Sequence, residues 1–357
     1  MKLLMTADAV GGVWQYATEL ATALVPHGVE TVLAVVGPIA AGTVAPAGVA
    51  MIDTGLPLDW LAIDAAAVHD AGTAIAALAR QVGADLVQLN SPSLAAARFP
   101  CPVVAVAHGC VGTWWDAAEG TALPPDLAWR AELTRAGLLA ADAVVTPSNS
   151  YAELVRRRYG LSRPIVTVHN GRTAVAPAER AEMAAHALTV GRLWDRVKNT
   201  ALLDRVAARL PVPLRAAGAI TGPHGETVGA HHLALLGTLS DHALHAELSQ
   251  RPIFVSAARF EPFGLAVLEA AQAGCALVLA DMPTFRELWD GAAIFVAGED
   301  EAAWVAAVKR LLAAPAERAA LAAAARERAG RYTPAATAAA MVRLYDGLLA
   351  DSRRAAA

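Results

Sequence analysis

The stretch that decides the fold reads Arg251-Pro-Ile-Phe-Val-Ser-Ala-Ala-Arg-Phe-Glu261-Pro-Phe-Gly-Leu-Ala-Val-Leu-Glu269-Ala-Ala-Gln-Ala-Gly274-Cys-Ala-Leu-Val-Leu-Ala280, and it continues to Asp290. Residues 252–256 form an apolar run that predicts a buried strand, and residues 263–273 follow a helical pattern. Gly274 ends that helix, and residues 275–280 form a second apolar run. A helix that ends at a glycine between two apolar runs is typical of a strand–helix–strand unit in a parallel sheet.

Two carboxylates, Glu261 and Glu269, lie on this unit with seven residues between them. Pro262 disfavours helical geometry at Glu261, which therefore belongs to the loop, whereas Glu269 lies roughly 7 Å along the helix axis. The amides of residues 263–265 open the helix and can face an anion. The two carboxylates could therefore grip the ends of a ligand with a phosphate between them. A capping glutamate followed by a solvated one has the same spacing, so both interpretations stand.

The rest of the chain alternates short apolar runs with helical patterns, which predicts βαβ units and mostly parallel sheets. The pattern runs once through the first half and restarts after residue 184. We therefore predict an α/β fold of two doubly wound, Rossmann-like domains. The expected parts are an N-terminal acceptor-side domain at 1–173, a linker at 174–184, a C-terminal nucleotide-binding domain at 185–334, and a C-terminal helix at 335–357 that crosses back to the first domain.

Composition narrows the class of protein. The 357 residues are enough for about two domains of roughly 150 residues each. A net charge of −4 and 17% charged residues argue against a nucleic-acid partner, which requires concentrated Lys and Arg. The three cysteines, Cys101, Cys110 and Cys275, form neither a disulfide framework nor a CxxC pair, which fits a reducing compartment.

No targeting or membrane-spanning segment is expected. Asp8 interrupts the first apolar run too early for a signal peptide. Residues 32–52 carry no charge, but prolines and glycines divide them into a strand, a loop and another strand, so we reject a membrane span. The basic run 156–158 is most simply a solvated helix end, and it leaves open a peripheral membrane contact. We expect a cytoplasmic protein, with the inner face of the membrane as the alternative.

Two loops of the first half carry candidate chemistry. Gly11-Gly12 follows the first strand and opens a helix, which suits close approach of a phosphate or sugar to backbone amides. It is not G-x-G-x-x-G, and the second strand ends in Gly37-Pro38 rather than an acidic residue, which argues against a dinucleotide dehydrogenase. His108 follows the strand 103–107 and could donate a hydrogen bond to a substrate oxygen, or could be a structural histidine.

Basic residues follow the first strand of the second half. Arg192 and Lys198 are six residues apart and could clamp a diphosphate, or form surface salt bridges. Five histidines cluster nearby in sequence, but no carboxylate or cysteine joins them in a recognised metal pattern: His224, His231, His232, His242 and His245. No Asp-x-Asp occurs in the chain. We therefore predict no metal site.

Three motifs in order give the sequence a family resemblance. They are Val190-Gly-Arg-Leu193 with Lys198, Leu236-Gly-x-Leu239-Ser-Asp241, and Glu261-Pro-Phe-Gly-Leu-x-x-x-Glu269. Together they resemble family four of the retaining glycosyltransferases, which have the GT-B architecture and an E-x7-E motif. Four N-terminal segments fall in the order expected for that family: Gly11-Gly12, His108-Gly109, Thr146-Pro-Ser148 and Asn170-Gly171.

The resemblance implies a role for each matching residue. Arg192 and Lys198 would hold the donor diphosphate, and Glu261 would bind hydroxyls of the donor sugar. The amides of Phe263, Gly264 and Leu265 would lie beside the sugar and phosphate. Further donor contacts would come from Glu269 to the ribose, from the backbone near Thr238 and Leu239 to the base, from His108 to the transferred sugar, and from Gly12 to the diphosphate or acceptor.

The implied activity is transfer of a sugar, with retention of configuration, from a nucleoside-diphosphate sugar to an acceptor, which could be a glycan, a lipid-linked molecule or a small molecule. The resemblance also implies two parallel sheets facing across a cleft, and no metal cofactor. A nucleotide-sugar epimerase or sugar phosphorylase on the same fold is the alternative. A glycosidase would also use two carboxylates, but it has no need for the basic pair. The choice among UDP, GDP and ADP, the sugar and the acceptor depend on loop shapes that the sequence does not reveal.

One segment departs from the family pattern. The usual Asn-Gly-Val-Asp appears here as Asn170-Gly-Arg-Thr173. The aspartate is missing, so no role is carried over to it. The change bears on the hinge between the domains and on the acceptor side.

Overall fold

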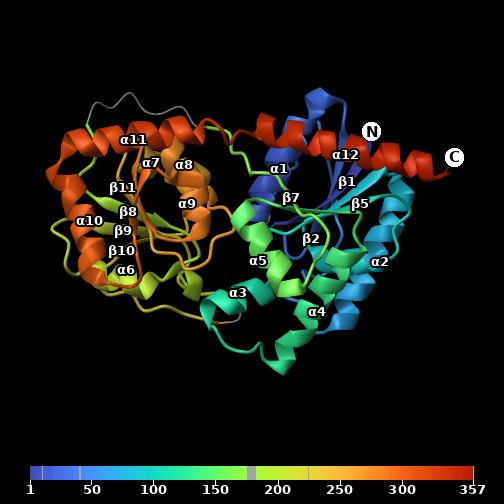
Figure 1. Ribbon diagram of the computed structural model, residues 1–357, viewed down its shortest axis with the longest axis horizontal. Helices are drawn as coiled ribbons and strands as arrows, with labels where there is room; N and C mark the ends of the chain where they lie inside the picture. The colour runs from blue at the N-terminus through green and yellow to red at the C-terminus, as the bar shows by residue number, and fades with distance from the viewer. Residues whose placement is uncertain (10, 40–41, 175–181, 224, 357) are drawn as a thin grey trace. The chain divides into compact units, whose positions relative to one another are not determined.

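The computed structural model describes residues 1–9, 11–39, 42–174, 182–223 and 225–356 (Figure 1). The chain divides into two compact units. Unit 1 comprises Met1–Gly171 and Thr333–Ala357, and unit 2 comprises Arg172–Tyr332. Most of the linker expected at 174–184 lies outside the described residues, because these omit 175–181.

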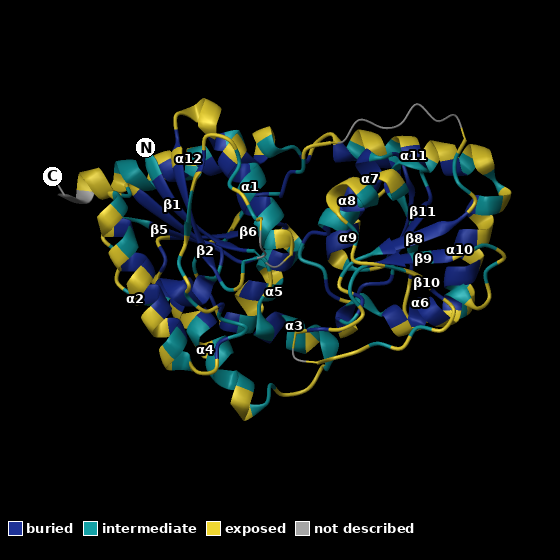
Figure 2. Cartoon of the chain, turned by 180° about the vertical axis from the view of Figure 1, so that it is seen from behind, coloured by how far each residue is buried: buried dark blue, intermediate teal, exposed yellow. Residues whose placement is uncertain are grey.

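Unit 1 is built on one sheet of seven parallel strands in the order β3-β2-β1-β4-β5-β6-β7. Its central strands are almost entirely buried, and Figure 2 shows them in dark blue. Such strands are mostly apolar because helices cover both faces of the sheet. The strands are β1 (Lys2–Asp8), β2 (Glu30–Val36), β3 (Ala50–Asp53), β4 (Leu86–Leu89), β5 (Val103–Val106), β6 (Ala143–Thr146) and β7 (Val166–Thr167).

Helices cover both faces of this sheet. One core joins the sheet to α1 and α12, and the other joins it chiefly to α2 and η2. The α-helices of unit 1 are α1 (Gly12–Leu24), α2 (Ala65–Val82), α3 (Val111–Ala118), α4 (Pro125–Ala140), α5 (Asn149–Tyr159) and α12 (Pro334–Ala356), and the 3-10 helices are η1 (Val25–His27) and η2 (Pro92–Ala96).

The last helix, α12, is part of the core of unit 1. It lies beside α1 (Figure 1), and its side chains Ala338, Met341 and Tyr345 are fully buried between α1 and the sheet. The hydroxyl of Tyr345 also donates a hydrogen bond to Gln88 on β4. Unit 1 is therefore completed by residues that lie more than 300 positions after its first strand.

Unit 2 repeats the architecture with six parallel strands in the order β10-β9-β8-β11-β12-β13. Trp304 on α10 is fully buried in the core on one face, and Trp289 on α9 in the core on the other. The strands are β8 (Ala187–Val190), β9 (Leu214–Ala217), β10 (Ala234–Gly237), β11 (Ile253–Ser256), β12 (Ala276–Ala280) and β13 (Ala293–Val296). The helices are η3 (Arg196–Lys198), α6 (Thr200–Ala207), α7 (Asp241–Ser249), α8 (Leu265–Gln272), α9 (Pro283–Trp289), α10 (Glu301–Ala313) and α11 (Pro315–Ala329).

The strand orders place a switch point in each sheet. The first strand of each unit lies beside its fourth, so the crossovers leave in opposite directions from β1 and β4 in unit 1, and from β8 and β11 in unit 2. In open α/β sheets, ligands bind at the carboxyl ends of the strands at such a point. The loops after these four strands are therefore the first places to look for a site.

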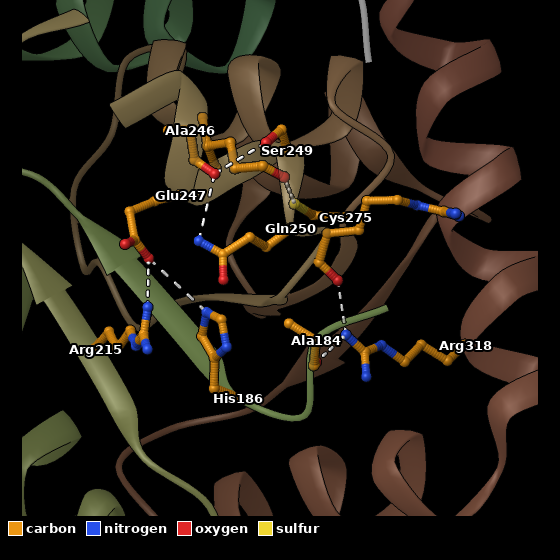
Figure 3. A network of polar contacts seen from close by, with 11 residues as sticks. Ala184, His186, Arg215, Ala246, Glu247, Ser249, Gln250, Cys275 and Arg318 are labelled. Carbon is orange, nitrogen blue, oxygen red and sulfur yellow. Dashed lines mark hydrogen bonds and ion pairs between the residues drawn. The ribbon is translucent and has the colours of Figure 1, made fainter. Parts of the chain in front are cut away.

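A polar network lies at the other end of the unit 2 strands (Figure 3). Arg215 on β9 donates to Glu247 on α7 at 2.8 Å, and His186, just before β8, lies 4.0 Å from the same carboxylate. Arg318 on α11 donates to the backbone carbonyls that precede β8 and β11, at 2.8 and 2.7 Å. Because it joins α7 and α11 to the amino ends of the strands, we interpret this network as structural.

The predicted fold class, two doubly wound units with parallel sheets, is confirmed. Among the α-helices and strands of the described residues, three were not anticipated: α3, α9 and β13. α3 contains glycine, threonine and two tryptophans, which are weak helix formers. α9 spans seven residues, which is too short for a helical period to stand out, and β13 spans four. Among the described residues, no helix is long and apolar enough to cross a bilayer.

Candidate functional site

The loops after β8 and β11 meet in unit 2, at the switch point of its sheet. A small pocket there is lined by residues of both strands and both loops, among them Gly191, Lys198, Ser256 and Glu261. Close backbone packing fixes the position of the loop after β8. A Cβ on Gly218, which follows β9, would lie 1.7 Å from the carbonyl oxygen of Gly191, so the two backbones touch where only glycine fits.

Lys198 and Glu261 form an ion pair at this pocket. Lys198 Nζ lies 2.6 Å from Glu261 Oε2, and both side chains are about one-fifth exposed. Lys198 ends η3, whose cap is the buried Asp195, and Glu261 lies in the loop before α8. The sequence predicted both residues at this edge but not their pairing. A partly buried charge-assisted hydrogen bond of this kind holds both groups in place.

Arg192 is more exposed than Lys198 and bonds elsewhere. Its Nη2 lies 3.1 Å from Asp195 Oδ2, its side chain is 53% exposed, and its guanidinium stands over the Trp194 ring at 5.6 Å. Arg192 and Lys198 thus flank one short turn, and each is paired with its own carboxylate. The diphosphate clamp at these two residues stays a prediction.

Residues 263–265 lead into α8, but the helix begins later than the sequence predicts. It starts at Leu265, because Gly264 adopts a left-handed φ of 93° and stands at the N-cap. Phe263 is buried and packs edge-on against Tyr332 at 5.6 Å, so its side chain belongs to the core. The backbone amides of Phe263 and Gly264, rather than their side chains, are therefore suited to contact an anion.

Glu269 lies one turn into α8 and has a partner that the sequence did not predict. Glu269 Oε1 accepts a hydrogen bond from Arg172 Nε at 2.7 Å, and the two side chains are 7% and 11% exposed. Burial raises the pKa of the Glu269 carboxyl, and Arg172 opposes that rise. Arg172 belongs to the segment where the sequence departs from the family, and no role was predicted for it.

Thr238 and Leu239 follow β10 and precede α7. Thr238 is exposed and Leu239 is half-buried. Ser240 then caps α7 by accepting a hydrogen bond from the Ala243 amide. The backbone at Thr238 and Leu239 therefore lies at the carboxyl edge of the same sheet as Lys198.

The remaining predicted residues, Gly12 and His108, belong to unit 1. Gly12 begins α1 directly after Gly11, whose φ of 100° favours glycine. His108 follows β5, and its ring meets Tyr16 of α1 edge-on, with ring centroids 4.4 Å apart. Both residues lie at the carboxyl edge of the unit 1 sheet.

A buried hydrogen-bond network fixes the proton on the His108 ring. His108 Nε2 lies 3.0 Å from Asn90 Oδ1, while Asn90 Nδ2 donates to the Thr6 carbonyl at 2.6 Å. Because an amide oxygen can only accept, Nε2 carries the proton and Nδ1 is left as an acceptor. Gln88 donates to the same Asn90 oxygen at 3.2 Å, so Asn90 links His108 to the core.

Asn90 was missed in the sequence, although the signal that singled out His108 also applies to it. It follows directly after the strand β4, at the switch point of the unit 1 sheet. A polar side chain at the carboxyl end of a buried parallel strand is the pattern that we applied to His108.

Burial lowers the pKa of the His108 imidazole to about 3. The usual pKa of a histidine is about 6.5. Below that pH, His108 binds a proton in the unfolded chain but stays neutral in the folded unit. Stability is therefore fully present above that value and falls as the pH drops from about 6.5 toward 3, by about 1 kcal/mol for each pH unit. Urea unfolding at pH 7.5, 6.5 and 5.5 should show a steeper acid loss in the wild type than in His108→Gln. Equal slopes for the two proteins would contradict this.

The sequence places five histidines near residues 224–245. Among the described residues, no group of three or more His, Cys, Asp or Glu side chains could hold a metal ion, and His224 lies outside those residues. The backbone amides of His231, His232 and Leu233 instead donate to one oxygen of Asp204, at 2.8 to 3.0 Å. That bond set fixes the loop before β10.

Two glycosyltransferase family models match the chain. Residues 10–173 match the family model described as Glycosyltransferase Family 4, and residues 224–328 match the one described as Glycosyl transferases group 1. No curated protein matches the chain.

Solved structures share its fold. A sucrose-phosphate synthase from Thermosynechococcus elongatus is 19% identical with a TM-score of 0.82, and the match covers 98% of this chain and 100% of that one. The lipopolysaccharide glycosyltransferase WaaG is 14% identical with a TM-score of 0.73, over 96% and 99% of the two chains. HepE from Anabaena, solved in complex with UDP-glucose, is 15% identical with a TM-score of 0.72, over 98% and 100%.

The resemblance predicted from the motifs is therefore confirmed. Two glycosyltransferase family models match in order along the chain, and the fold is that of GT-B enzymes. The chain belongs to the family-four-like glycosyltransferases and is a glycosyltransferase with the GT-B fold.

Proposed function

We propose that this glycosyltransferase takes its sugar from a nucleoside-diphosphate donor, retains the anomeric configuration and needs no metal ion. The observation that carries this is the ion pair between Lys198 and Glu261 at the switch point of unit 2, next to the start of α8. A cation, a carboxylate and the backbone amides at the start of α8 then stand together where a sugar diphosphate would bind. The bound UDP-glucose of HepE is the kind of donor that we have in mind.

The cationic side chains are suited to the leaving group. As the bond from the anomeric carbon to the diphosphate oxygen breaks, negative charge accumulates on the diphosphate. Lys198 and Arg192 would stabilise that charge, together with the α8 amides, and preorganised electrostatic stabilisation of this kind is usually the largest contribution to catalysis. With two cations and the helix dipole available, a divalent metal is not required to neutralise the leaving group.

The sugar would be held by Glu261 and attacked on the face from which the diphosphate departs. In this front-face displacement, the acceptor hydroxyl oxygen bonds to the anomeric carbon through an oxocarbenium-like transition state. The departing diphosphate oxygen takes the hydroxyl proton, so the reaction balances without a protein base. We assign no carboxylate as nucleophile, because Glu261 is held by Lys198 and Glu269 by Arg172.

His108 would contact the transferred sugar as an acceptor. Its Nε2 proton is directed to Asn90, and its low pKa keeps the ring neutral at pH 7. A neutral imidazole whose Nδ1 is unprotonated accepts a hydrogen bond from a sugar hydroxyl and adds no charge next to the oxocarbenium-like carbon. A protonated ring there would oppose the positive charge of the transition state.

Binding of a nucleoside diphosphate tests the donor assignment. We expect UDP, GDP or ADP to bind the wild type, and Arg192→Ala to weaken that binding by about 1–3 kcal/mol, because a charge-assisted bond to phosphate is lost. Isothermal titration calorimetry measures both. Arg310→Ala, which removes an arginine paired with Glu317 on α10 and α11, is the matched control and should bind like the wild type. Absence of binding by all three nucleotides would overturn the proposal.

Three further measurements test the sugar, the need for a metal and the reaction type. A thermal-shift screen of nucleotide sugars identifies the donor, since a bound ligand raises the apparent stability. Transfer with that donor should continue in excess chelator, and strict dependence on added Mg²⁺ or Mn²⁺ would contradict the metal-free mechanism. Product analysis without acceptor distinguishes an epimerase, which would convert the donor under those conditions.

A further inference from the structure

The pair of Arg172 and Glu269 is the feature of unit 2 that the proposed function leaves unexplained. A carboxylate that is 7% exposed is costly to keep ionised, and burial does raise the pKa of Glu269. Arg172 is the cation that opposes this. It stands at a position where the family pattern noted above has an uncharged valine.

The backbone of Arg172 is held on both sides. Its amide donates to the Tyr332 carbonyl at 3.3 Å, and its carbonyl accepts from Gln272 Nε2 at 2.8 Å. Gln272 lies on α8, three residues after Glu269 and on the same face of the helix. The guanidinium is therefore fixed relative to α8 before any ligand arrives.

The geometry leaves one carboxylate oxygen for a ligand. Arg172 Nε holds Glu269 Oε1, whereas Glu269 Oε2 accepts no hydrogen bond from any described residue. Several side-chain atoms of the described residues are both fully enclosed and without a hydrogen-bond partner, but Glu269 Oε2 is not one of them. Oε2 therefore retains contact with solvent. An ionised carboxylate with one oxygen anchored and one available is suited to accept a hydrogen bond from a hydroxyl.

We propose that Arg172 is a positioning residue for the donor nucleotide, which holds Glu269 ionised and turned so that Oε2 receives a ribose hydroxyl. This rests on the proposed function, since it presupposes a nucleotide in unit 2. Among the described residues, the other titratable groups that face Glu269 are His245 and Asp241, both on α7. Asp241 lies 3.8 Å from Arg172 and is 72% exposed, so solvent screens its effect on Glu269.

The test compares a nucleotide that has ribose hydroxyls with one that lacks them. The probe is whichever of UDP, GDP and ADP binds the wild type best, together with its 2′,3′-dideoxy form. Calorimetry at pH 6, 7 and 8 gives the ratio of the two dissociation constants. For the wild type we expect a ratio of about 10 to 100 that does not change with pH. Failure of every nucleotide to bind the wild type would refute the proposed function rather than the role of Arg172.

Three variants separate the effect of the charges of Arg172 and Glu269 from other effects of the substitutions. Arg172→Met should lower the ratio at least about 5-fold at pH 6 and regain part of it at pH 8, because Glu269 then loses its proton only at higher pH. Its affinity for the dideoxy nucleotide should stay within about 3-fold of the wild type, since the phosphate contacts are untouched. Arg172→Lys retains the charge and should keep most of the ratio, whereas Glu269→Gln should show a low ratio at every pH.

Two results would overturn the role of Arg172. One is an unchanged, pH-independent ratio in a folded Arg172→Met protein. The other is tighter binding of both nucleotides by that variant, which would mean that Arg172 fills the ribose position instead of preparing it. If Arg172→Met does not fold, Arg172→Lys and Glu269→Gln decide: equal ratios in these two variants and the wild type contradict the proposal.

Discussion

Replacement of Lys198 by methionine is expected to reduce turnover of the nucleotide sugar by about 10²- to 10³-fold, the usual loss when one preorganised charge-stabilising group is removed. Methionine retains much of the side-chain volume but not the ammonium. The charge on the leaving diphosphate develops in the transition state, so kcat should fall more than KM rises. Release of nucleoside diphosphate from the identified donor, followed over time, provides both constants.

The chain contains a matched control for this experiment. Lys309 lies exposed on α10 of the same unit, and Lys309→Met makes the same chemical change there. It should leave kcat within about 2-fold of the wild type, as for most surface substitutions. A kcat of Lys198→Met that matches this control, in a protein with an unchanged Tm, would show that the ammonium does not stabilise the leaving group.

Two glycine-to-alanine substitutions in unit 1 should change stability in opposite directions. Gly137 lies in α4, and a Cβ there would meet the Pro92 carbonyl oxygen of η2 at 1.8 Å. Gly137→Ala should therefore destabilise unit 1 by about 1–3 kcal/mol, or more if the helix cannot move. Gly347 lies in α12 with no described heavy atom within 4 Å of its added Cβ, and Gly347→Ala should stabilise by about 0.5–1 kcal/mol.

Urea unfolding of the two variants and the wild type measures this difference. The substitution is chemically the same and both sites are helical, so intrinsic helix propensity acts equally on both. The gap between the variants then reports the contact between α4 and η2 alone. A Gly137→Ala protein that gained stability as Gly347→Ala does would mean that η2 yields at little cost.

The sheets could be predicted because their strands are buried on both faces. β4, β6 and β9 are short runs of mostly apolar residues, because most side chains that lie between two helical layers are apolar. The helix before Gly274 was found for a different reason, the left-handed φ of 80° that only glycine adopts readily. Both signals are local, and a single sequence displays them.

The pairings within the site could not be predicted in this way. Lys198 and Glu261 were both expected at one sheet edge, but their ion pair depends on how two loops turn after their strands. Arg172 and Glu269 are 97 positions apart, and no period or motif relates them. Asn90 could have been found from the sequence, because it directly follows a predicted strand. Contacts between side chains of distant loops are a product of packing.

The last helix has a consequence for the order in which the protein is made. Unit 1 lacks Met341 and Tyr345, two fully buried side chains of its core, until α12 has been synthesised. Unit 2 is a continuous segment, Arg172–Tyr332, so all of its strands leave the ribosome earlier. Although unit 2 comes second in the sequence, we expect it to reach its native state first, while the earlier-made strands of unit 1 remain an open sheet awaiting their final layer.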